Sequence, residues 1–363
     1  MKLLGKESIF CNFYNIYNKP IACMRSFPLL LLLFLLPILA LSQKDVMDSA
    51  AFFTDERVIE VNLSTDLKKL MTSKKDNDFQ PATVTFICPD SFSVTEEIRV
   101  CARGQFRRKN CYMPSTTFDF KNPQSPKLSC LGKLKMVSGC ATSASDEQLL
   151  LKEYIIYKMY NILTEKSFRV RLLRIKYDDT KDKVKLYNQY AFVIEDVKDL
   201  AKRNKSKEYK NKINTEATDR NYMTLVALFQ YMIGNTDWAV PVAHNIKLIL
   251  PKKDSTARPV VVPYDFDFAG LVDAPYAIPA PELGTESVRE RVYRGFARNM
   301  AELQAVIAIF KEKKDSIYSL INNFALIKSS EREIMIKYLE EFYRIIDSKN
   351  LINDYFIVNA RKQ

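Results

Sequence analysis

The chain has 363 residues, of which 47% are hydrophobic and 27% charged, with 15 Pro and only 8 Gly. This is the composition of a globular protein, and it excludes collagen-like, low-complexity and multi-span membrane proteins. The single histidine, His244, excludes His-rich metal sites and most zinc-finger spacings. The sequence has no G-x-G-x-x-G fingerprint and no Walker A loop, since Gly132-Lys133 is followed by Leu134.

An apolar segment near the N-terminus has the features of a secretory signal peptide. Residues 27–42, FPLLLLLFLLPILALS, follow Arg25 and end in a small-x-small cleavage pattern. The run is shorter than the ~20 apolar residues of a membrane span, which disfavours an uncleaved anchor. We therefore expect residues 1–42 to be a signal peptide cleaved near Ser42, with Met24 as an alternative start. The mature protein is then expected to be extracytoplasmic (periplasmic, surface-associated or secreted), without a transmembrane span.

The chain is basic, with a formal net charge of +12, and the excess concentrates partly at residues 107–109 and 202–212. A basic surface attracts anionic glycans, lipid headgroups, acidic proteins or nucleotides, although such runs are also common as solvated loops. No motif interleaves basic with aromatic residues, so the sequence predicts no specific nucleic-acid binding.

Five cysteines follow the predicted signal peptide, and export would allow them to form disulfides. Their odd number leaves one thiol over, and the sequence does not decide the pairing. A metal cluster is the weaker interpretation, because no C-x-x-C pair occurs among them. The five are Cys88, Cys101, Cys111, Cys130 and Cys140.

Alternating hydrophobicity makes the first third of the predicted mature chain β-rich. The period then changes to that of a helix, which begins near a capping box of Ser145 and Gln148 and runs to about Thr164. Two more strands follow this helix. The predicted strands are residues 57–63, 82–88, 96–103, 116–121, 131–138, 168–177 and 184–194.

The second half of the chain has a mainly helical pattern. A basic, polar segment at 201–217 is predicted to be an exposed loop, and an apolar helix at 219–233 stops at Gly234. The further predicted elements are short strands at 245–250 and 259–264 and a C-terminal helix with a capping box of Ser330 and Glu333.

This order of elements predicts an α+β protein of two lobes with a ligand cleft between them. Residues 43–196 would form a β-rich N-terminal lobe that contains one long helix and an inter-lobe strand. Residues 197–363 would form a mainly helical C-terminal lobe that carries the polar loops. In that lobe Arg291, Tyr293 and Arg294 are candidates to line the cleft.

Glu153 is an unusual residue in the apolar stripe of the first long helix. A carboxylate buried there needs a partner or a proton. Lys133 and Lys135 lie on one face of a strand because of their spacing of two, so either can supply that partner. A glutamate at the helix edge that reaches water is the alternative, and position alone supports it at least as well.

A polar loop, Gly234-Asn235-Thr236-Asp237-Trp238, follows the apolar helix, and His244 and Asn245 precede the next strand. The only tryptophan and the only histidine of the chain lie here. Functional residues are often carried by loops that rigid elements hold in place. A helix-capping turn would explain the start of the loop, but not Asp237 together with Asn245.

A second polar segment, Tyr264-Asp265-Phe266-Asp267-Phe268, follows the apolar strand 259–262. Asp265 and Asp267 fall on one face and the aromatic residues on the other. Carboxylate and amide oxygens suit a hard cation such as Mg²⁺. A polar turn is the alternative, but turns seldom need three aromatic residues in five. We therefore predict a magnesium site that includes these carboxylates and Asn245.

These predicted features together match the parts of a protein-kinase-type phosphoryl-transfer site. The parts are a Lys–Glu pair that contacts phosphates, a loop Asp that receives the acceptor, and an Asn and an Asp that bind Mg²⁺. In these runs and their order the sequence resembles HipA-type kinases and the CotH family of secreted kinases. The resemblance spans roughly residues 96–270 and is carried by KLKMVSGC, LLLKEYIIYKMYNILT, YAFVIEDVKDLAKR, IGNTDWAVPVAHNIKLI and VPYDFDFAG.

The resemblance implies a two-lobed protein-kinase-like fold that uses ATP and Mg²⁺. It implies that Lys135, with Lys133 as the alternative, contacts the nucleotide phosphates, and that Glu153 orients this lysine. Asp237 would be the catalytic residue that acts on the acceptor hydroxyl. The other implied roles are Mg²⁺ binding by Asn245, Asp265 and Asp267, a position near the adenine for Glu195, and a first-strand turn at Arg103-Gly104.

The favoured function is an exported kinase-like enzyme that transfers the ATP γ-phosphate to Ser or Thr of an envelope or surface protein. The alternative is a catalytically inactive kinase-fold protein that acts as a binding or assembly factor in the cell envelope. The presence of Asp237, Asn245, Asp265 and Glu153 favours the enzyme. Export and the eight-residue spacing from Asp237 to Asn245, which is longer than is usual in the family, favour the alternative.

Overall fold

The structure is a computed structural model that describes residues 49–362, apart from residues 74, 76, 88–92, 122, 126–127, 129–130 and 255. The predicted signal peptide, residues 1–42, lies outside the described residues, as do Cys88 and Cys130. The described residues belong to the compact unit formed by Asp45–Gln363.

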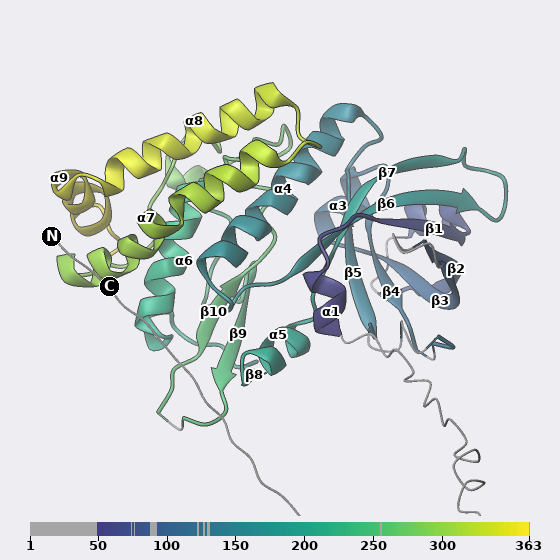
Figure 1. Ribbon diagram of the computed structural model, residues 1–363, viewed down its shortest axis with the longest axis horizontal. Coiled ribbons are helices and arrows are strands. Elements are labelled where there is room, and N and C mark those ends of the chain that lie inside the picture. The colour runs from purple at the N-terminus through teal and green to yellow at the C-terminus, as the bar shows by residue number, and fades with distance from the viewer. Residues whose placement is uncertain are drawn as a thin grey trace, which may run out of the picture. The chain divides into compact units, whose positions relative to one another are not determined.

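Seven strands between Ile59 and Ile194 close into a barrel (Figure 1). Their order around the barrel is β1-β2-β3-β4-β5-β7-β6, and every neighbouring pair is antiparallel except β1 and β6. These two run parallel, with Ile59 opposite Leu173. The strands are β1 (Ile59–Thr65), β2 (Gln80–Ile87), β3 (Ser93–Arg103), β4 (Ser115–Asp119), β5 (Lys133–Ser138), β6 (Val170–Asp179) and β7 (Tyr187–Ile194).

Apolar residues that alternate with outward-facing residues along each strand fill the interior of the barrel. Val61, Val84, Val100 and Phe118 are completely buried there, and they come from four successive strands. Because the side-chain period of a strand is two, the residues between them face outward. On β5 this rule places Lys135 on the outer face of the barrel, with Leu134 and Met136 in its core.

The α+β composition is confirmed, but the expected two-lobed protein-kinase-like fold is wrong. A closed seven-stranded barrel is not the β-rich lobe of such a fold. The closure depends on β1 pairing with β6, which lies more than a hundred residues later in the chain. Local hydrophobic patterns locate both strands but carry no information about which distant edges will pair.

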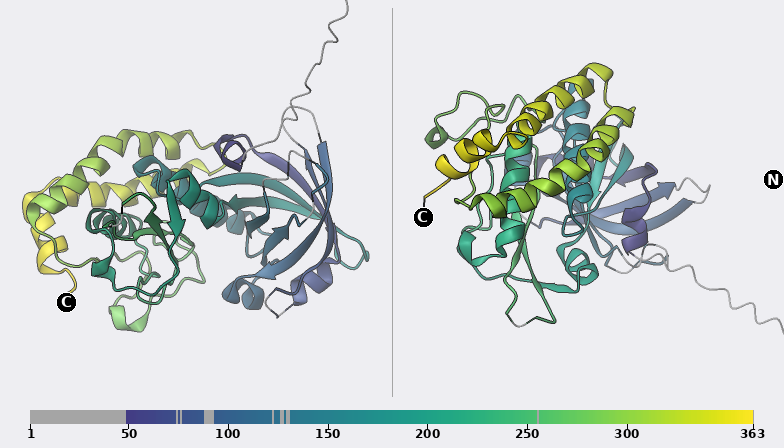
Figure 2. Two further views of the ribbon diagram at one scale, coloured as in Figure 1. Left: turned by 90° about the horizontal axis from the view of Figure 1, so that it is seen from below. Right: turned by 60° about the vertical axis from the view of Figure 1, so that its left-hand side comes forward.

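The remaining elements pack outside the barrel. The long helix α4 (Ala144–Leu163) contacts β6 and β7 and also the helix α7 (Met300–Asn323), as Figures 1 and 2 show. A small sheet of order β10-β9-β8 contacts α5 and α6. The other elements are α1 (Ser49–Thr54), α2 (Leu67–Thr72), α3 (Gln105–Asn110), α5 (Val197–Arg203), β8 (Ser206–Glu208), η1 (Thr215–Ala217), α6 (Arg220–Ile233), β9 (Ile246–Pro251), β10 (Val260–Pro263), η2 (Pro281–Leu283), α8 (Ser329–Ile346), α9 (Lys349–Asn353) and η3 (Asp354–Val358).

The helix boundaries confirm some sequence signals and correct others. Helix α6 stops at Gly234, as the sequence predicts, and this glycine caps the helix in the left-handed conformation. Helix α4 begins after Ser143 instead of Ser145, and the Ser143 hydroxyl accepts the Asp146 amide. The capping box predicted at Ser330 is wrong, because α8 begins at residue 329 without a side-chain cap. Segment 201–217 is not one loop, since it holds β8 and η1.

Among the described residues, no helix combines the length and the apolar character that crossing a membrane requires.

Two glycines bring together the loops that follow α6 and β10. The Gly270 amide donates to the Gly234 carbonyl over 3.1 Å, and the Leu271 amide donates to Ile233 over 3.0 Å. A side chain on Gly234 would overlap the hydroxyl of Tyr338. This close approach sets the relative position of the two loops that carry Asp237 and Asp265.

We expect Gly234→Ala to destabilise the protein more than Gly284→Ala does. Both glycines have a φ near +67°, so each alanine incurs about 1 kcal/mol of left-handed backbone strain. A Cβ at Gly284 meets no atom within 4 Å, whereas one at Gly234 displaces Tyr338 and adds roughly 1–3 kcal/mol. Urea unfolding of the two variants measures the difference, and equal losses would show that the glycine contact imposes no constraint.

Candidate functional site

A cavity of about 370 Å³ lies between the outer face of the barrel and the loops that follow α6 and β10. Val137 and Ile194 contribute an apolar wall from β5 and β7. The other wall is polar and comes from three separate chain segments. The charged and polar lining residues include Arg103, Arg107, Ser115, Asp237, His244, Asn245, Asp265 and Asp267.

Asp237 is held by partners on both carboxylate oxygens. Its Oδ1 lies 2.7 Å from His244 Nε2, and its Oδ2 accepts a hydrogen bond of 2.9 Å from Asn245 Nδ2. The same Asn245 amide donates to the Asp237 carbonyl over 2.9 Å. Asp237 therefore presents a carboxylate of fixed orientation at the cavity, and its side chain stays 38% exposed.

The chain between Asp237 and Asn245 forms a tight loop that closes the eight-residue spacing. Ala239 and His244 exchange backbone hydrogen bonds of 3.0 and 2.9 Å. Ala243 and Asn245 have positive φ angles of 53° and 50°, which turn the chain back toward Asp237. The long spacing noted in the sequence is thus absorbed by the loop, and it does not separate the two side chains.

Asp265 is the most perturbed acid of the cavity. Its φ is 64°, and its amide donates to the Tyr157 hydroxyl over 2.8 Å, but no described residue hydrogen-bonds to its carboxylate. Burial, together with the negative charge of Asp267, raises the pKa of Asp265 from 3.8 to about 6, against the opposing effect of Arg107. A carboxylate with open oxygens and a raised pKa is typical of functional sites.

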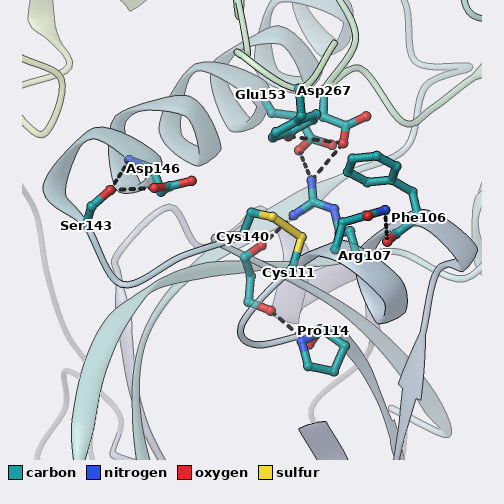
Figure 3. The surroundings of a disulfide bond; sticks show 12 residues. Phe106, Arg107, Cys111, Pro114, Cys140, Ser143, Asp146, Glu153 and Asp267 are labelled. Atoms are coloured by element: carbon teal, nitrogen blue, oxygen red, sulfur yellow. Dashed lines mark hydrogen bonds and ion pairs between the residues drawn. A yellow bond between two sulfur atoms is a disulfide. The ribbon is translucent and has the colours of Figure 1, made fainter. Parts of the chain in front are cut away.

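Arg107 is the cation at the centre of the site (Figure 3). Its Nη2 lies 3.2 Å from Glu153 Oε2 and 3.1 Å from Asp267 Oδ2, and its Nη1 donates to the Ser138 carbonyl. Burial alone would lower the pKa of Arg107, but the two carboxylates outweigh it and raise that pKa. Arg107 thus joins α3 to α4 and to the loop after β10.

The partner of Glu153 is an arginine and not a lysine. Glu153 is 1% exposed, and burial raises its pKa well above the ordinary value even beside Arg107. No ion pair joins it to Lys133 or Lys135. Lys133 is exposed, with its ammonium 5.3 Å from the ring centre of Phe79.

Lys135 lies next to the cavity and does not reach Glu153. It stands opposite Ile194 in the barrel and shares the outer face of β5 with Val137, and both of these residues line the cavity. Burial and the nearby charge of Arg103 lower the pKa of Lys135. The spacing of two correctly placed Lys133 and Lys135 on one face, but that face does not meet Glu153.

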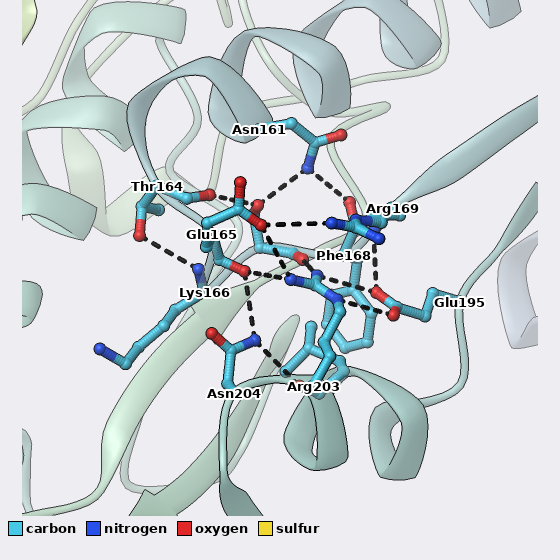
Figure 4. Close-up of polar contacts among 11 residues, drawn as sticks. Asn161, Thr164, Glu165, Lys166, Phe168, Arg169, Glu195, Arg203 and Asn204 are labelled. Atoms are coloured by element: carbon cyan, nitrogen blue, oxygen red, sulfur yellow. Dashed lines mark hydrogen bonds and ion pairs between the residues drawn. The ribbon is translucent and has the colours of Figure 1, made fainter. Parts of the chain in front are cut away.

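Glu195 belongs to a structural ion-pair network (Figure 4). Its two carboxylate oxygens accept from Arg203 over 2.8 and 3.0 Å, and one also accepts the Arg169 amide over 3.1 Å. Glu195 is buried and does not line the cavity, although Ile194 beside it does. These contacts tie the end of β7 to α5, and the resemblance's position for Glu195 near an adenine stays a prediction.

A disulfide joins Cys111 to Cys140 and lies close to Arg107 (Figure 3). It ties the C-terminal end of α3 to the segment after β5, where the Tyr112 amide also donates to the Cys140 carbonyl over 2.8 Å. Cys101 is a free, buried thiol whose pKa is raised by burial. The disulfide therefore fixes the short helix from which Arg107 reaches the carboxylates.

Three lining residues were not singled out by the sequence. Arg107 was counted only within the basic run 107–109, and Arg103 only as part of a turn. The Ser115 hydroxyl is buried and has no hydrogen-bond partner among the described residues. One feature of the sequence could have pointed to Arg107: its basic run follows directly after the exposed turn at Gly104.

Of the three C-terminal residues predicted to line the cleft, one lies beside the site and two do not. Arg294 donates to the Thr236 carbonyl, next to Asp237. Arg291 pairs with Glu341, and Tyr293 is buried, so neither lines the cavity. Within the described part of the chain, no group of three or more His, Cys, Asp and Glu side chains is arranged to hold a metal ion.

No protein-family model matches this chain, and no curated protein matches it either. The function must therefore be argued from the cavity itself.

Asp265→Asn is expected to stabilise the protein by roughly 3 kcal/mol at neutral pH and by much less near pH 4. The pKa of Asp265 is raised to about 6, so between pH 4 and 6 the folded protein keeps a proton that the unfolded chain has released. The free energy of unfolding therefore falls as the pH rises through this range, and the variant removes that loss.

Chemical denaturation at the two pH values measures this difference. Asp254→Asn is the control, because hydrogen bonds from Thr256 lower the pKa of Asp254 and its removal should bring no gain at neutral pH. If Asp265→Asn destabilises the protein equally at both pH values, the fold does not raise the pKa of this carboxyl group.

Proposed function

We propose that this cavity binds a nucleoside triphosphate, with ATP as the expected one, together with a divalent cation. The terminal phosphate would pass to a Ser or Thr hydroxyl of an envelope or surface protein. The observation that carries the proposal is the meeting of Asp237, Asn245 and Asp265 with Arg103 at one cavity. Phosphoryl transfer needs carboxylates that receive a hydroxyl or a cation, beside a cationic side chain that receives the phosphates.

The basic side of the cavity suits the phosphates. Arg103 lines it and forms no ion pair with the described residues, so its guanidinium is available to an anion. Lys135 lies on the outer face of the barrel, and the charge of Arg103 lowers its pKa, so the two cations are close to each other. Lys135 is therefore a second candidate to bind this anion. The buried, unpartnered Ser115 hydroxyl adds a hydrogen-bond donor to the same lining.

The acidic side of the cavity fits a divalent cation. Asp265 has open carboxylate oxygens, and Asn245 uses its amide nitrogen on Asp237, which leaves its oxygen free among the described residues. Mg²⁺ needs only one or two protein oxygens when substrate phosphates and water complete its shell. When bound, the cation neutralises charge on the transferred phosphate. Asp267, predicted as a third ligand, accepts from Arg107 and Tyr276, and we assign it to holding Arg107.

Asp237 is positioned to receive the acceptor hydroxyl. In the proposed step the hydroxyl oxygen bonds to the terminal phosphorus, and the bond from that phosphorus to the bridging oxygen of the nucleotide breaks. The hydroxyl proton passes to the Asp237 carboxylate, and the nucleoside diphosphate leaves. His244 and Asn245 orient the carboxylate, so rotation of Asp237 does not compete with this alignment.

A non-catalytic binding or assembly factor is the second candidate. The contacts of Arg107 favour it, because Glu153 and Asp267 already neutralise this cation. An arginine paired with two carboxylates attracts an incoming phosphate less than a lysine paired with Glu153 alone would. The enzyme is still better supported, because Arg103 keeps a free guanidinium and Asp237 keeps a defined orientation.

The disulfide supports the expected localisation. A bond between Cys111 and Cys140 is typical of proteins that fold in an oxidising compartment. We therefore keep the proposal that the protein acts outside the cytoplasm, on partners of the cell envelope or surface.

Asp237→Asn is expected to lower phosphate transfer by about 10²–10⁴-fold while leaving the dissociation constant of Mg·ATP unchanged. The amide keeps the size of the side chain but cannot take the acceptor proton. The assay uses ATP labelled on its γ-phosphate and a pool of synthetic Ser and Thr peptides.

Asp273→Asn is the matched control, because Asp273 pairs with Arg289 outside the cavity. Undiminished transfer by Asp237→Asn would remove this residue from the mechanism. A parent protein that neither binds Mg·ATP nor transfers phosphate would favour the binding factor.

A further inference from the structure

A second cavity, of about 460 Å³, adjoins the first on the far side of Asp237. Asp237, His244 and Phe268 line both cavities, so a molecule in the second one lies within reach of the Asp237 carboxylate. We call this second cavity the side groove. Its apolar lining includes Trp238, Val242, Ile278, Pro279 and Val288, and the charged residues Glu282 and Arg294 line it as well.

The side groove exposes apolar surface that the fold does not cover. Val242 is 65% exposed and Ile278 is 77% exposed, and both line it. Trp238, the only tryptophan of the chain, is buried and lines the same cavity. Large aliphatic side chains left in water beside a polar cavity commonly mark the position where an apolar ligand group binds.

We infer that the side groove binds the acceptor polypeptide through a bulky aliphatic residue that flanks its Ser or Thr. This inference rests on the proposed function and adds the residue type that the site prefers beside the acceptor Ser or Thr. The continuity of the two cavities at Asp237 places the hydroxyl and the flanking residue in adjoining spaces. Val242 and Ile278 offer no hydrogen bonds, so an aliphatic side chain fits this part of the groove better than the hydroxyls of a sugar do.

Arg294 fixes the wall that the two cavities share. It donates to the Thr236 carbonyl, and its guanidinium lies 5.8 Å from the ring centre of Trp238. Because Asp237 follows Thr236 directly, this contact keeps the catalytic carboxylate and the side groove in one fixed arrangement. A flanking residue that binds in the groove can therefore position the hydroxyl.

The test uses Trp238 as an internal probe of the side groove, because no other tryptophan contributes to the fluorescence. Two pools of short synthetic peptides with a central Ser are titrated into the full chain, one with Leu and one with Asn at the flanking positions. We expect a saturable change in emission with the Leu pool and a much weaker response to the Asn pool.

Val242→Asp and Ile278→Asp are each expected to weaken binding of the Leu pool about tenfold. Leu186→Asp is the matched control, because Leu186 is 56% exposed but lies outside the side groove. Equal responses to the two pools, or a response that neither groove variant changes, would overturn the inference.

Phosphate transfer to the same pools separates this inference from the proposed function. Preferred phosphorylation of the Leu pool, lost in Val242→Asp, supports both. Binding of Mg·ATP and of the Leu pool without any transfer would overturn the assignment of the side groove to an acceptor. Binding of the Leu pool by a protein that does not bind Mg·ATP would refute the proposed function and retain the groove as a peptide site.

Discussion

The site depends on one buried cation, Arg107, which lies between Glu153 and Asp267. The three residues come from α3, from α4 and from the loop after β10, so a single guanidinium joins three parts of the fold. Removing one partner of such a group leaves an uncompensated buried charge, at a cost of about 3–5 kcal/mol. The disulfide from Cys111 to Cys140 also holds this cation in place, because it secures the helix that carries Arg107.

The cavity beside this cation has a basic side and an acidic side. The barrel contributes Arg103 and the unpartnered Ser115 hydroxyl, and the loops after α6 and β10 contribute Asp237 and Asp265. The Gly234–Gly270 contact holds those two loops together. A raised pKa at Asp265 means that its charge costs stability in the folded protein. Such a cost is typical of a residue kept for binding or catalysis.

The loops of the site could be predicted from the sequence because their signals are local. Gly234 ends an apolar helix before Asp237, Asn245 directly precedes β9, and Asp265 follows β10. The structure brings these three residues to one cavity. The partner of Glu153 could not be predicted. Arg107 lies 46 residues earlier in a short helix with no apolar period of its own, and it had the appearance of a solvated basic run.

The barrel was missed for a related reason. Strand patterns located its β-strands approximately, but closure depends on the parallel pairing of β1 with β6. Pairing between distant edges is decided by the whole fold and leaves no mark in either segment. The two-lobed expectation followed from the order of elements alone, whereas the site residues followed from chemistry that does not require that fold.

The central claim is that the cavity binds a nucleotide with a divalent cation, and thermal unfolding with ATP, with and without Mg²⁺, tests it most directly. A ligand at about 100 times its dissociation constant adds roughly 2.7 kcal/mol to the free energy of unfolding. We predict an increase that requires both ATP and Mg²⁺, is absent in Asp265→Ala and is retained in Asp254→Ala. No increase in the folded parent protein, or an equal increase in Asp265→Ala, would contradict the account.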